Sequence, residues 1–239
     1  MTTHPRATTS VVDALRGRLV VSCQAYPGEP MRHPETMAQI AQAAVAGGAA
    51  GIRAQGLADL ALIAERLPAV PLIGLWKVGH EGVFITPTLR HARAVGAAGA
   101  GIVALDGTRR PRPDGLTLAQ TVAALHADDD GAGSDGRGTL VMADCGSLDD
   151  ALAAADAGAD LVGTTLAGYT GERPTTDGPD LDLIARIADR LPGVPLVAEG
   201  RIHTPAQAAA ARDAGAHTVV VGTAITHPTT ITGWFTAAL

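Results

Sequence analysis

Aromatic side chains are scarce in this chain of 239 residues, of which Phe, Trp and Tyr together make up 3%. Basic residues form no run with interleaved aromatics, and the formal net charge is −6. A nucleic-acid-binding surface normally needs a basic patch, so we expect no nucleic-acid partner. The chain is rich in alanine and has 29 glycines, a composition that suits helices packed closely against a sheet.

Long apolar runs are also missing. No run approaches the roughly 18 consecutive apolar residues that indicate a membrane-spanning helix. Residues 1–10 are polar and lack the apolar core of a secretory signal. We therefore expect a single domain over residues 1–239 with a flexible tail at residues 1–10, a cytoplasmic location and no contact with a membrane.

Cysteine is rare, and the common cofactor motifs are absent. Cys23 and Cys145 lie in or just after apolar runs, which is typical of buried free thiols. Neither His-Glu-x-x-His nor Cys-x-x-Cys occurs, so we expect no metal site. No P-loop or Gly-x-Gly-x-x-Gly fingerprint follows the first apolar run, so we expect no nucleotide cofactor. The acidic, glycine-rich segment 128–138 lacks EF-hand spacing and is predicted to be a solvated loop.

Short apolar runs alternate with longer alanine-rich stretches. The runs are almost wholly apolar, as expected for parallel strands that are covered on both faces. The stretches between them have helical spacing, and N-cap residues are predicted at Ser147, at Thr204 and, before a helix at 88–97, at Thr86. The predicted strands are 19–23, 50–54, 72–75, 101–105, 140–143, 161–164, 196–199 and 218–222.

Two short motifs repeat where a helix is followed by a strand. Ala-Gly-Ala, or Ala-Gly-Gly-Ala, occurs at 46–49, 98–100, 157–159 and 214–216, before every second strand. Arg-Leu-Pro-x-Val-Pro-Leu occurs at 66–72 and 190–196, at strands three and seven. Repeats half a barrel apart predict a single (β/α)8 TIM barrel, and an open doubly wound sheet is the alternative.

Polar residues follow the predicted strands at the end where barrel enzymes carry out their chemistry. Strands three and seven face each other across a ring of eight, so Lys77 and Glu199 are expected on opposite walls of one mouth. There they can act on two sides of one carbon as a catalytic pair, or form a stabilising ion pair. The other strand ends supply substrate-binding candidates, namely Gln24, Arg53, Asp106, Asp144, Thr164 and Thr165.

The last two strand ends predict a phosphate site. Barrels often bind phosphate after strands seven and eight, through backbone amides. Gly200 and Gly222 allow the backbone to approach a phosphate, Arg201 offers a charged donor, and Thr223 follows Gly222. We therefore expect a small phosphorylated sugar as the ligand of this mouth.

Eight segments in a fixed order add a resemblance to a known family. They are Ser-Cys-Gln-Ala at 22–25, Pro-Gly-Glu-Pro at 27–30, Gly-Ile-Arg-Ala at 51–54, Phe-Ile-Thr-Pro-Thr at 84–88, Ala-Leu-Asp at 104–106, Gly-Thr-Thr-Leu-Ala-Gly-Tyr-Thr at 163–170, Ala-Glu-Gly-Arg-Ile at 198–202 and Val-Gly-Thr-Ala-Ile-Thr at 221–226. From about residue 19 to its end, the chain resembles the N-acetylmannosamine-6-phosphate 2-epimerases. The resemblance implies an isomerase that converts N-acetylmannosamine 6-phosphate to N-acetylglucosamine 6-phosphate in amino-sugar and sialic acid catabolism.

The resemblance also implies roles for individual residues. Lys77 and Glu199 become the catalytic pair. The sugar and its N-acetyl group are assigned to Gln24, Arg53 and Asp106, and the phosphate to Gly200, Arg201, Gly222 and Thr223. The sequence departs from the family pattern at 78–80, where Val-Gly-His replaces an Arg-Asp-Tyr-like sequence after the lysine, and at 145–146, where Cys-Gly replaces Ile-Ser or Val-Ser.

Other functions fit part of the pattern. A pentulose-phosphate epimerase or a thiamine-phosphate synthase relative would share the phosphate site, but ribulose-phosphate epimerases carry metal-binding histidines where this chain has Arg53, Lys77 and Asp144. A Schiff-base aldolase more often carries its lysine on strand six. A sugar-phosphate sensor would bind without turnover, and the presence of both Lys77 and Glu199 argues against it. The alanine-rich helices are compatible with a homodimer.

Overall fold

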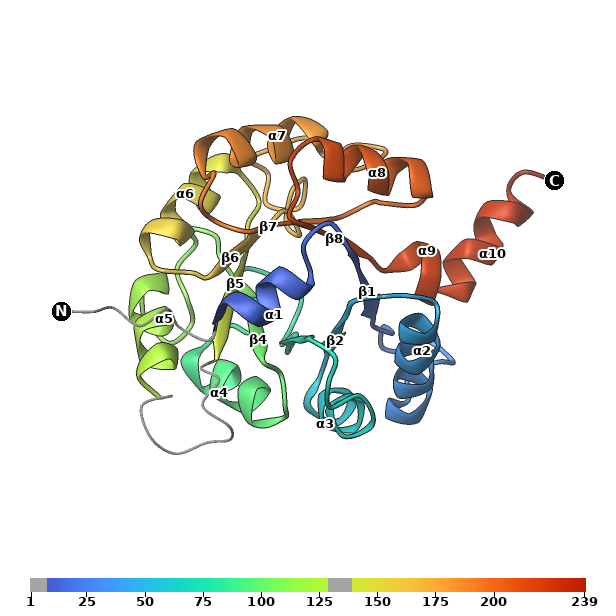
Figure 1. Cartoon of the computed structure of the whole chain (residues 1–239), viewed down its shortest axis with the longest axis horizontal. Coiled ribbons are helices and arrows are strands. Elements are labelled where there is room, and N and C mark those ends of the chain that lie inside the picture. Colours follow the sequence, from blue (N-terminus) through green and yellow to red (C-terminus); the bar gives the residue numbers. More distant parts are fainter. Residues whose placement is uncertain (1–7, 129–138) are drawn as a thin grey trace.

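The computed structural model describes residues 8–128 and 139–239. Its strands are parallel, follow one another around the ring in chain order, and close into a barrel because β8 pairs with β1. Figure 1 shows helices surrounding this ring. The elements are α1 (Thr8–Ala14), β1 (Leu19–Cys23), α2 (Pro34–Ala46), β2 (Gly51–Gln55), α3 (Leu57–Arg66), β3 (Leu72–Leu75), α4 (Leu89–Ala97), β4 (Ile102–Asp106), α5 (Leu118–Ala127), β5 (Leu140–Asp144), α6 (Leu148–Asp156), β6 (Leu161–Gly163), α7 (Leu181–Arg190), β7 (Leu196–Glu199), α8 (Pro205–Asp213), β8 (Thr218–Val221), α9 (Thr223–Thr226) and α10 (Pro228–Thr236).

The predicted (β/α)8 barrel is therefore confirmed, and the open sheet is excluded. The eight predicted strands are present, and their ends differ from the prediction by one residue at most. Helices α2 to α8 pack on the outside, where alanine, valine, leucine and isoleucine side chains fill the interface with the strands. No helix within residues 8–128 and 139–239 combines the length and the apolar composition that a membrane span requires.

The repeated glycine motifs explain how each helix passes into the next strand. The glycines take a left-handed backbone, which other residues adopt at a cost. A Cβ atom at Gly99 would lie 2.5 Å from the Cβ atom of Ala64, so close packing also requires glycine there. The four junction glycines and their φ angles are Gly48 (102°), Gly99 (100°), Gly158 (88°) and Gly215 (110°).

Two of the three predicted N-caps are confirmed and one is wrong. The Ser147 hydroxyl accepts from the amide of Asp150, and Thr204 forms a capping box at the start of α8. Helix α4 is capped by Thr88 instead of Thr86. The reason is that Thr86 is fully buried and its hydroxyl is bound elsewhere, as described below.

The N-terminal end of the barrel is closed by α1, which crosses in front of the ring in Figure 1. Leu15 is fully buried there and packs with Val20 and other inward side chains. Residues 8–10, assigned by the sequence to a tail, begin this helix instead, and residues 1–7 lie outside the described residues. Of the predicted loop 128–138, only Asp128 is described; it lies at the end of α5 and pairs with Arg93 of α4. Residues 129–138 lie outside the described part of the chain.

Candidate active site

The carboxyl ends of the strands surround a cavity of about 790 Å³. Lys77 follows β3, and Glu199 is the last residue of β7, four strands further around the ring. Both side chains line the cavity, together with Gln24, Arg53 and Thr165. Beneath these side chains the barrel interior is apolar, and inward residues such as Ile73 and Val197 fill it. The mouth is therefore the level at which the barrel interior changes from apolar to polar.

A buried ion-pair cluster forms the floor of the cavity. Nη2 of Arg53 lies 2.7 Å from Oδ2 of Asp144, and Nε of Arg53 lies 3.2 Å from Oε2 of Glu199. The side chains of Arg53 and Asp144 are 1% and 0% exposed. The hydroxyl of Thr165 donates to Oδ1 of Asp144 at 2.7 Å and lies 3.2 Å from the Glu199 carboxylate. The Arg53 guanidinium thus holds two carboxylates, one from the end of β5 and one from the end of β7, the two strands next to β6.

Two buried polar atoms at the cavity have no hydrogen-bond partner within the described residues. One is Oε1 of Gln24, whose amide nitrogen donates to the hydroxyl of Ser22 at 2.8 Å. The other is Nε of Arg53, which is close to Glu199 but does not direct its hydrogen at the carboxylate. An unsatisfied buried acceptor and donor are costly unless a ligand completes them. Both atoms lie at residues that line the cavity, and each has hydrogen-bonding capacity left for a polar ligand.

The surroundings of Lys77 favour its neutral form. Burial lowers the pKa of the Lys77 ammonium, and the Arg53 cation lowers it further, while the Glu199 and Asp144 carboxylates act in the opposite direction. The ammonium also lies 5.3 Å from the ring centroid of Tyr26. A lysine of this kind can exchange a proton near neutral pH more readily than an exposed one.

The surroundings of Glu199 favour its protonated form. Burial raises the pKa of this carboxyl, and the charge of Asp144 adds to the effect, while Arg53 lowers the pKa. The pKa of Glu199 is thus raised and the pKa of Lys77 is lowered, so the two values lie closer together than in free side chains. Both groups are therefore better suited to proton transfer.

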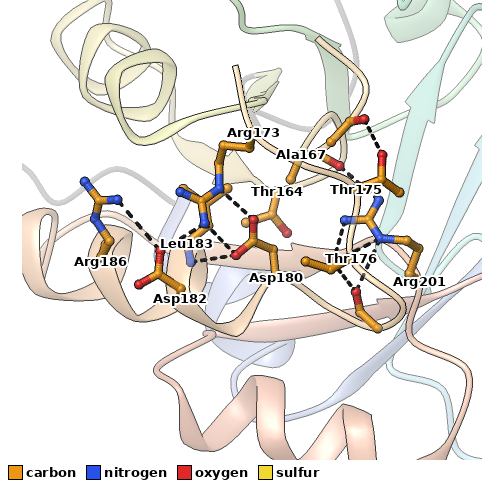
Figure 2. A network of polar contacts seen from close by, with 12 residues as sticks. Thr164, Ala167, Arg173, Thr175, Thr176, Asp180, Asp182, Leu183, Arg186 and Arg201 are labelled. Atoms are coloured by element: carbon orange, nitrogen blue, oxygen red, sulfur yellow. Dashed lines mark hydrogen bonds and ion pairs between the residues drawn. The ribbon is translucent and has the colours of Figure 1, made fainter. Parts of the chain in front are cut away.

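The β7–β8 side of the mouth contains the residues predicted to bind phosphate. Gly200, Arg201, Gly222 and Thr223 all line the cavity. The Arg201 guanidinium is also bound to the loop after β6, where it donates to the carbonyl of Ala167 at 2.9 Å and to the hydroxyl of Thr176 at 3.1 Å (Figure 2). Arg201 therefore joins the end of β7 to that loop while its charge remains beside the cavity.

The loop after β6 is fixed at its far end by a second arginine. Figure 2 shows Arg173 bound to both oxygens of Asp180, at 2.6 and 2.8 Å, and to Asp182. Asp180 also caps α7 by accepting from the amide of Leu183 at 3.0 Å. The loop that carries Tyr169 over the mouth is thus anchored by ion pairs at α7 and by Arg201 at β7.

Three predicted site residues lie behind the cavity wall. The carboxylate of Asp106 is bound by Thr108 and Arg110, and Asp144 contacts Arg53 and Thr165. The hydroxyl of Thr164 donates to the carbonyl of Glu199 at 2.9 Å and accepts from its amide at 3.1 Å. The three side chains are fully or almost fully buried, and they do not line the cavity.

Sequence reasoning missed several cavity-lining residues. Arg32 and Gln55 come from the β1–α2 and β2 segments, and His227 lies between α9 and α10. His227 is buried, with its ring 5.2 Å from that of Tyr26 and its Nδ1 3.7 Å from the Glu29 carboxylate. Neither spacing nor motif identifies these residues, because their loops are brought to the mouth by the closure of the barrel.

The composition of the chain also points to Lys77. Of the 18 Lys and Arg residues, only Lys77 is a lysine. A chain that otherwise uses arginine, and not lysine, for its positive charges has its single lysine in the barrel mouth. No group of three or more His, Cys, Asp or Glu side chains in the described part of the chain could hold a metal ion.

Comparison with known proteins supports one family. The family model described as "Putative N-acetylmannosamine-6-phosphate epimerase" matches residues 37–239. A protein of Cutibacterium acnes named "Putative N-acetylmannosamine-6-phosphate 2-epimerase" is 62% identical over 97% of this chain and 98% of its own length. A protein of the same name from Corynebacterium glutamicum is 46% identical, with 94% of each chain covered.

Solved structures give the same result. The N-acetylmannosamine-6-phosphate 2-epimerase of Clostridium perfringens superimposes with a TM-score of 0.89 and 36% identity, and 100% of each chain is covered. A thiamine phosphate pyrophosphorylase of Pyrococcus furiosus, at a TM-score of 0.57 and 17% identity, shares the fold alone. These matches confirm the resemblance inferred from the sequence motifs. The chain belongs to the N-acetylmannosamine-6-phosphate epimerase family.

Proposed function

We propose that this chain converts N-acetylmannosamine 6-phosphate to N-acetylglucosamine 6-phosphate by inverting C2, as a step of amino-sugar and sialic acid catabolism. The observation that carries the proposal is the position of Lys77 and Glu199, at the ends of two strands that lie four apart around one cavity. The names of relatives that are 62% and 46% identical supply the substrate. No metal ion or cofactor is part of the proposal.

Inversion at C2 breaks one C–H bond and forms another on the opposite face. The C2 proton is acidic when C1 is a carbonyl, so we propose that the sugar reacts in its open-chain form or an equivalent enolisable form. One group of the pair removes the proton, an enolate forms, and the other group delivers a proton to the opposite face. Because the pair Lys77–Glu199 then holds one proton before and after turnover, the same residues serve both directions.

The electrostatics of the mouth support this chemistry. The lowered pKa of Lys77 makes a neutral amine available, and the raised pKa of Glu199 makes a neutral acid available. We assign the enolate oxygen to the Arg53 guanidinium, whose unsatisfied Nε–H can donate to it. Arg53 is held in place by Asp144, so its charge is present before the reaction begins.

The remaining polar groups divide between the sugar and its phosphate. We propose that Gln24 accepts a hydrogen bond from the sugar or its N-acetyl group, and that Thr165 contacts a hydroxyl. The phosphate is assigned to the backbone at Gly200 and Gly222, with Thr223 and with the charge of Arg201. Each of these residues lines the same cavity.

The residues behind the wall are proposed to bind substrate through their neighbours. Asp144 holds Arg53 and Thr165, and Thr164 fixes the backbone of Glu199. Asp106 shapes the β4–α5 loop through the hydroxyl and amide of Thr108. Substitution of these three residues is expected to lower the precision of the site instead of removing a direct contact.

The direct test is incubation with N-acetylmannosamine 6-phosphate in deuterated buffer, followed by proton NMR at C2 without added metal or nucleotide. The proposal predicts N-acetylglucosamine 6-phosphate with deuterium at C2. Binding of the sugar phosphate without conversion would favour a sensor, and the absence of both binding and exchange by a folded sample would favour another phosphorylated ligand.

We also propose that the chain forms a homodimer through its C-terminal helix. Helix α10 extends away from the barrel in Figure 1 and has no buried residue, and Trp234 and Phe235 are 40% and 71% exposed. Neighbouring exposed aromatic side chains are a feature of protein–protein contact surfaces, which supports this proposal. Light scattering should give twice the chain mass, and the double variant Trp234→Ser with Phe235→Ser should give a monomer; a monomeric parent protein would refute the proposal.

The cellular setting remains a proposal as well. We propose that the protein works in the cytoplasm without a nucleic-acid partner, and the net charge of −6 supports the second part. Fractionation of cells and a binding assay with duplex DNA at low salt test the two statements. Recovery in an extracytoplasmic fraction, or DNA binding that salt weakens, would contradict them.

A further inference from the structure

The segment that carries Lys77 folds back on itself after β3. The amide of Thr86 donates to the carbonyl of Trp76 at 2.8 Å, and Lys77 pairs with Ile85 in an antiparallel bridge. Residues 76–86 therefore form a short hairpin at the barrel mouth, which we call the lysine hairpin. The catalytic lysine lies on its outgoing strand.

The lysine hairpin fills a gap between two barrel strands. The ladder of β3 and β4 ends at the pair Gly74–Val103, well before Lys77. Beyond it, the returning strand of the hairpin takes the place next to β4, because the amide of Asp106 donates to the carbonyl of Ile85 at 2.9 Å. The position of Lys77 is thus set by the hairpin and its attachment to β4, and no longer by the β3–β4 ladder.

Thr86 is the point of attachment. Its side chain is 0% exposed, and its hydroxyl accepts from the amide of Trp76 at 3.1 Å and donates to the carbonyl of Ala104 at 2.6 Å. The carbonyl of Thr86 accepts from Nη2 of Arg112 at 2.9 Å. The hydroxyl thus connects the residue before Lys77 directly to β4.

The backbone of Thr86 is strained. Its φ is 46°, a left-handed conformation that is a genuine outlier for a β-branched residue. Within residues 8–128 and 139–239, the other non-glycine residue with positive φ is Arg201, two positions after Glu199. Such strain persists only where the surroundings enforce it, and it gathers at functional sites. One strained residue thus lies in the hairpin that carries Lys77, and the other lies just after Glu199.

We propose that Thr86 is a positioning residue, whose hydroxyl ties the lysine hairpin to β4 and so holds the Lys77 ammonium among Arg53, Glu199 and the ring of Tyr26. This inference rests on the proposed function for the role of Lys77 in turnover. The claim that the Thr86 hydroxyl fixes the position of Lys77 does not depend on that function. Without the hydroxyl, the Trp76 amide loses its side-chain acceptor and the hairpin can move with its lysine.

Three variants separate positioning from stability. Thr86→Val removes the hydroxyl and keeps the shape, while Thr86→Ser keeps the hydroxyl. Thr121→Val is the matched control, because Thr121 is also 0% exposed and its hydroxyl donates to a carbonyl, that of Thr117 at the N-cap of α5, at 3.1 Å. We expect Thr86→Val to lower kcat roughly tenfold to a hundredfold with KM changed less than about threefold, since a misplaced catalytic group lowers the rate more than binding. Thr86→Ser and Thr121→Val should keep kcat within about threefold of the parent.

A direct readout uses the fact that the chain has a single lysine. Protein grown with lysine labelled with carbon-13 at Cε gives one lysine signal, whose pH titration reports Lys77 alone. In Thr86→Val, the titration should move to higher pH, because the ammonium leaves the buried site beside Arg53. The titration of Thr86→Ser and Thr121→Val should match that of the parent protein.

Each outcome supports or overturns the inference. An unchanged kcat and an unchanged lysine titration in folded Thr86→Val would overturn it, as would equal losses in Thr86→Val and Thr121→Val. If Thr86→Val does not fold, Thr86→Cys takes its place, because a thiol is a weaker donor and acceptor than the hydroxyl, and an unchanged titration there has the same meaning. If the titration moves but Lys77→Ala still turns over substrate, the positioning holds and the proposed role of Lys77 fails.

Discussion

Arg53 and Asp144 form a fully buried ion pair across the barrel, with Nη2 of Arg53 2.7 Å from Oδ2 of Asp144. The two residues come from β2 and β5, so the pair also ties together two strands that lie three apart around the ring. Removing the Asp144 charge leaves the buried Arg53 guanidinium with only the Glu199 carboxylate, 3.2 Å away, as an ionic partner within the described residues. Asp144→Asn should therefore lower the free energy of unfolding by about 3–5 kcal/mol, measured by urea denaturation.

The exposed ion pair of Arg93 and Asp128 provides the control for this experiment. Exposed pairs are screened by water and contribute little. Asp128→Asn should leave the denaturation midpoint almost unchanged. If Asp144→Asn and Asp128→Asn lowered the free energy of unfolding equally, the buried cluster would have no special structural role.

The pH dependence of kcat should be bell-shaped and narrow. In the proposed mechanism the pair Lys77–Glu199 holds one proton, so activity is lost at low pH when the pair gains a second proton and at high pH when it loses its last one. Burial raises the pKa of Glu199 and lowers that of Lys77, so the acid limb lies above the usual carboxyl range and the alkaline limb below the usual lysine range. The profile of kcat is the appropriate one, because kcat/KM also reports the substrate phosphate. A flat profile from about pH 5 to 10 would contradict the assignment.

Gln24 should affect substrate binding more than stability. Its Oε1 is buried and has no hydrogen-bond partner among the residues that the structure describes, so the free protein gains little from that atom. Gln24→Met should raise KM about threefold to tenfold, which corresponds to the ~0.5–1.5 kcal/mol of one hydrogen bond. The urea midpoint should change little. An unchanged KM would show that the atom does not face the sugar.

Arg201 should link phosphate binding to the order of the β6–α7 loop. Arg201→Gln removes the charge beside the cavity and weakens the contacts to Ala167 and Thr176. We expect a higher KM for the phosphorylated sugar and faster proteolysis within residues 164–180. Arg186→Gln is the control, because Arg186 pairs only with the exposed Asp182 at 3.7 Å among the contacts of Figure 2. Equal behaviour of the two variants would remove Arg201 from the site.

The sequence predicted what periodicity and spacing can determine. Strands buried on both faces give continuous apolar runs, and glycine motifs mark the helix-to-strand junctions, so strand ends were placed to within one residue. The pairing of Lys77 with Glu199 across one mouth followed from counting strands around a closed ring.

The direction of each side chain at a strand end was beyond that reasoning. Thr164 and Thr165 are adjacent, yet the hydroxyl of Thr164 bonds to the backbone of Glu199 and only Thr165 lines the cavity. Successive residues at a strand end point to different sides, and the exact register decides which one faces the substrate. The same limit applies to Thr86, which was assigned to a helix cap because its buried partners on β4 cannot be read from neighbouring residues.

The central claim is that Lys77 and Glu199 act on opposite faces of C2, and isotope exchange tests it most directly. Each epimer is incubated in deuterated buffer with Lys77→Met and with Glu199→Gln, and C2 is followed by NMR. We predict that neither variant interconverts the epimers, and that each still exchanges the C2 proton of one epimer only, a different one in each variant. Interconversion by either variant, or exchange of the same epimer by both, would contradict the two-sided mechanism.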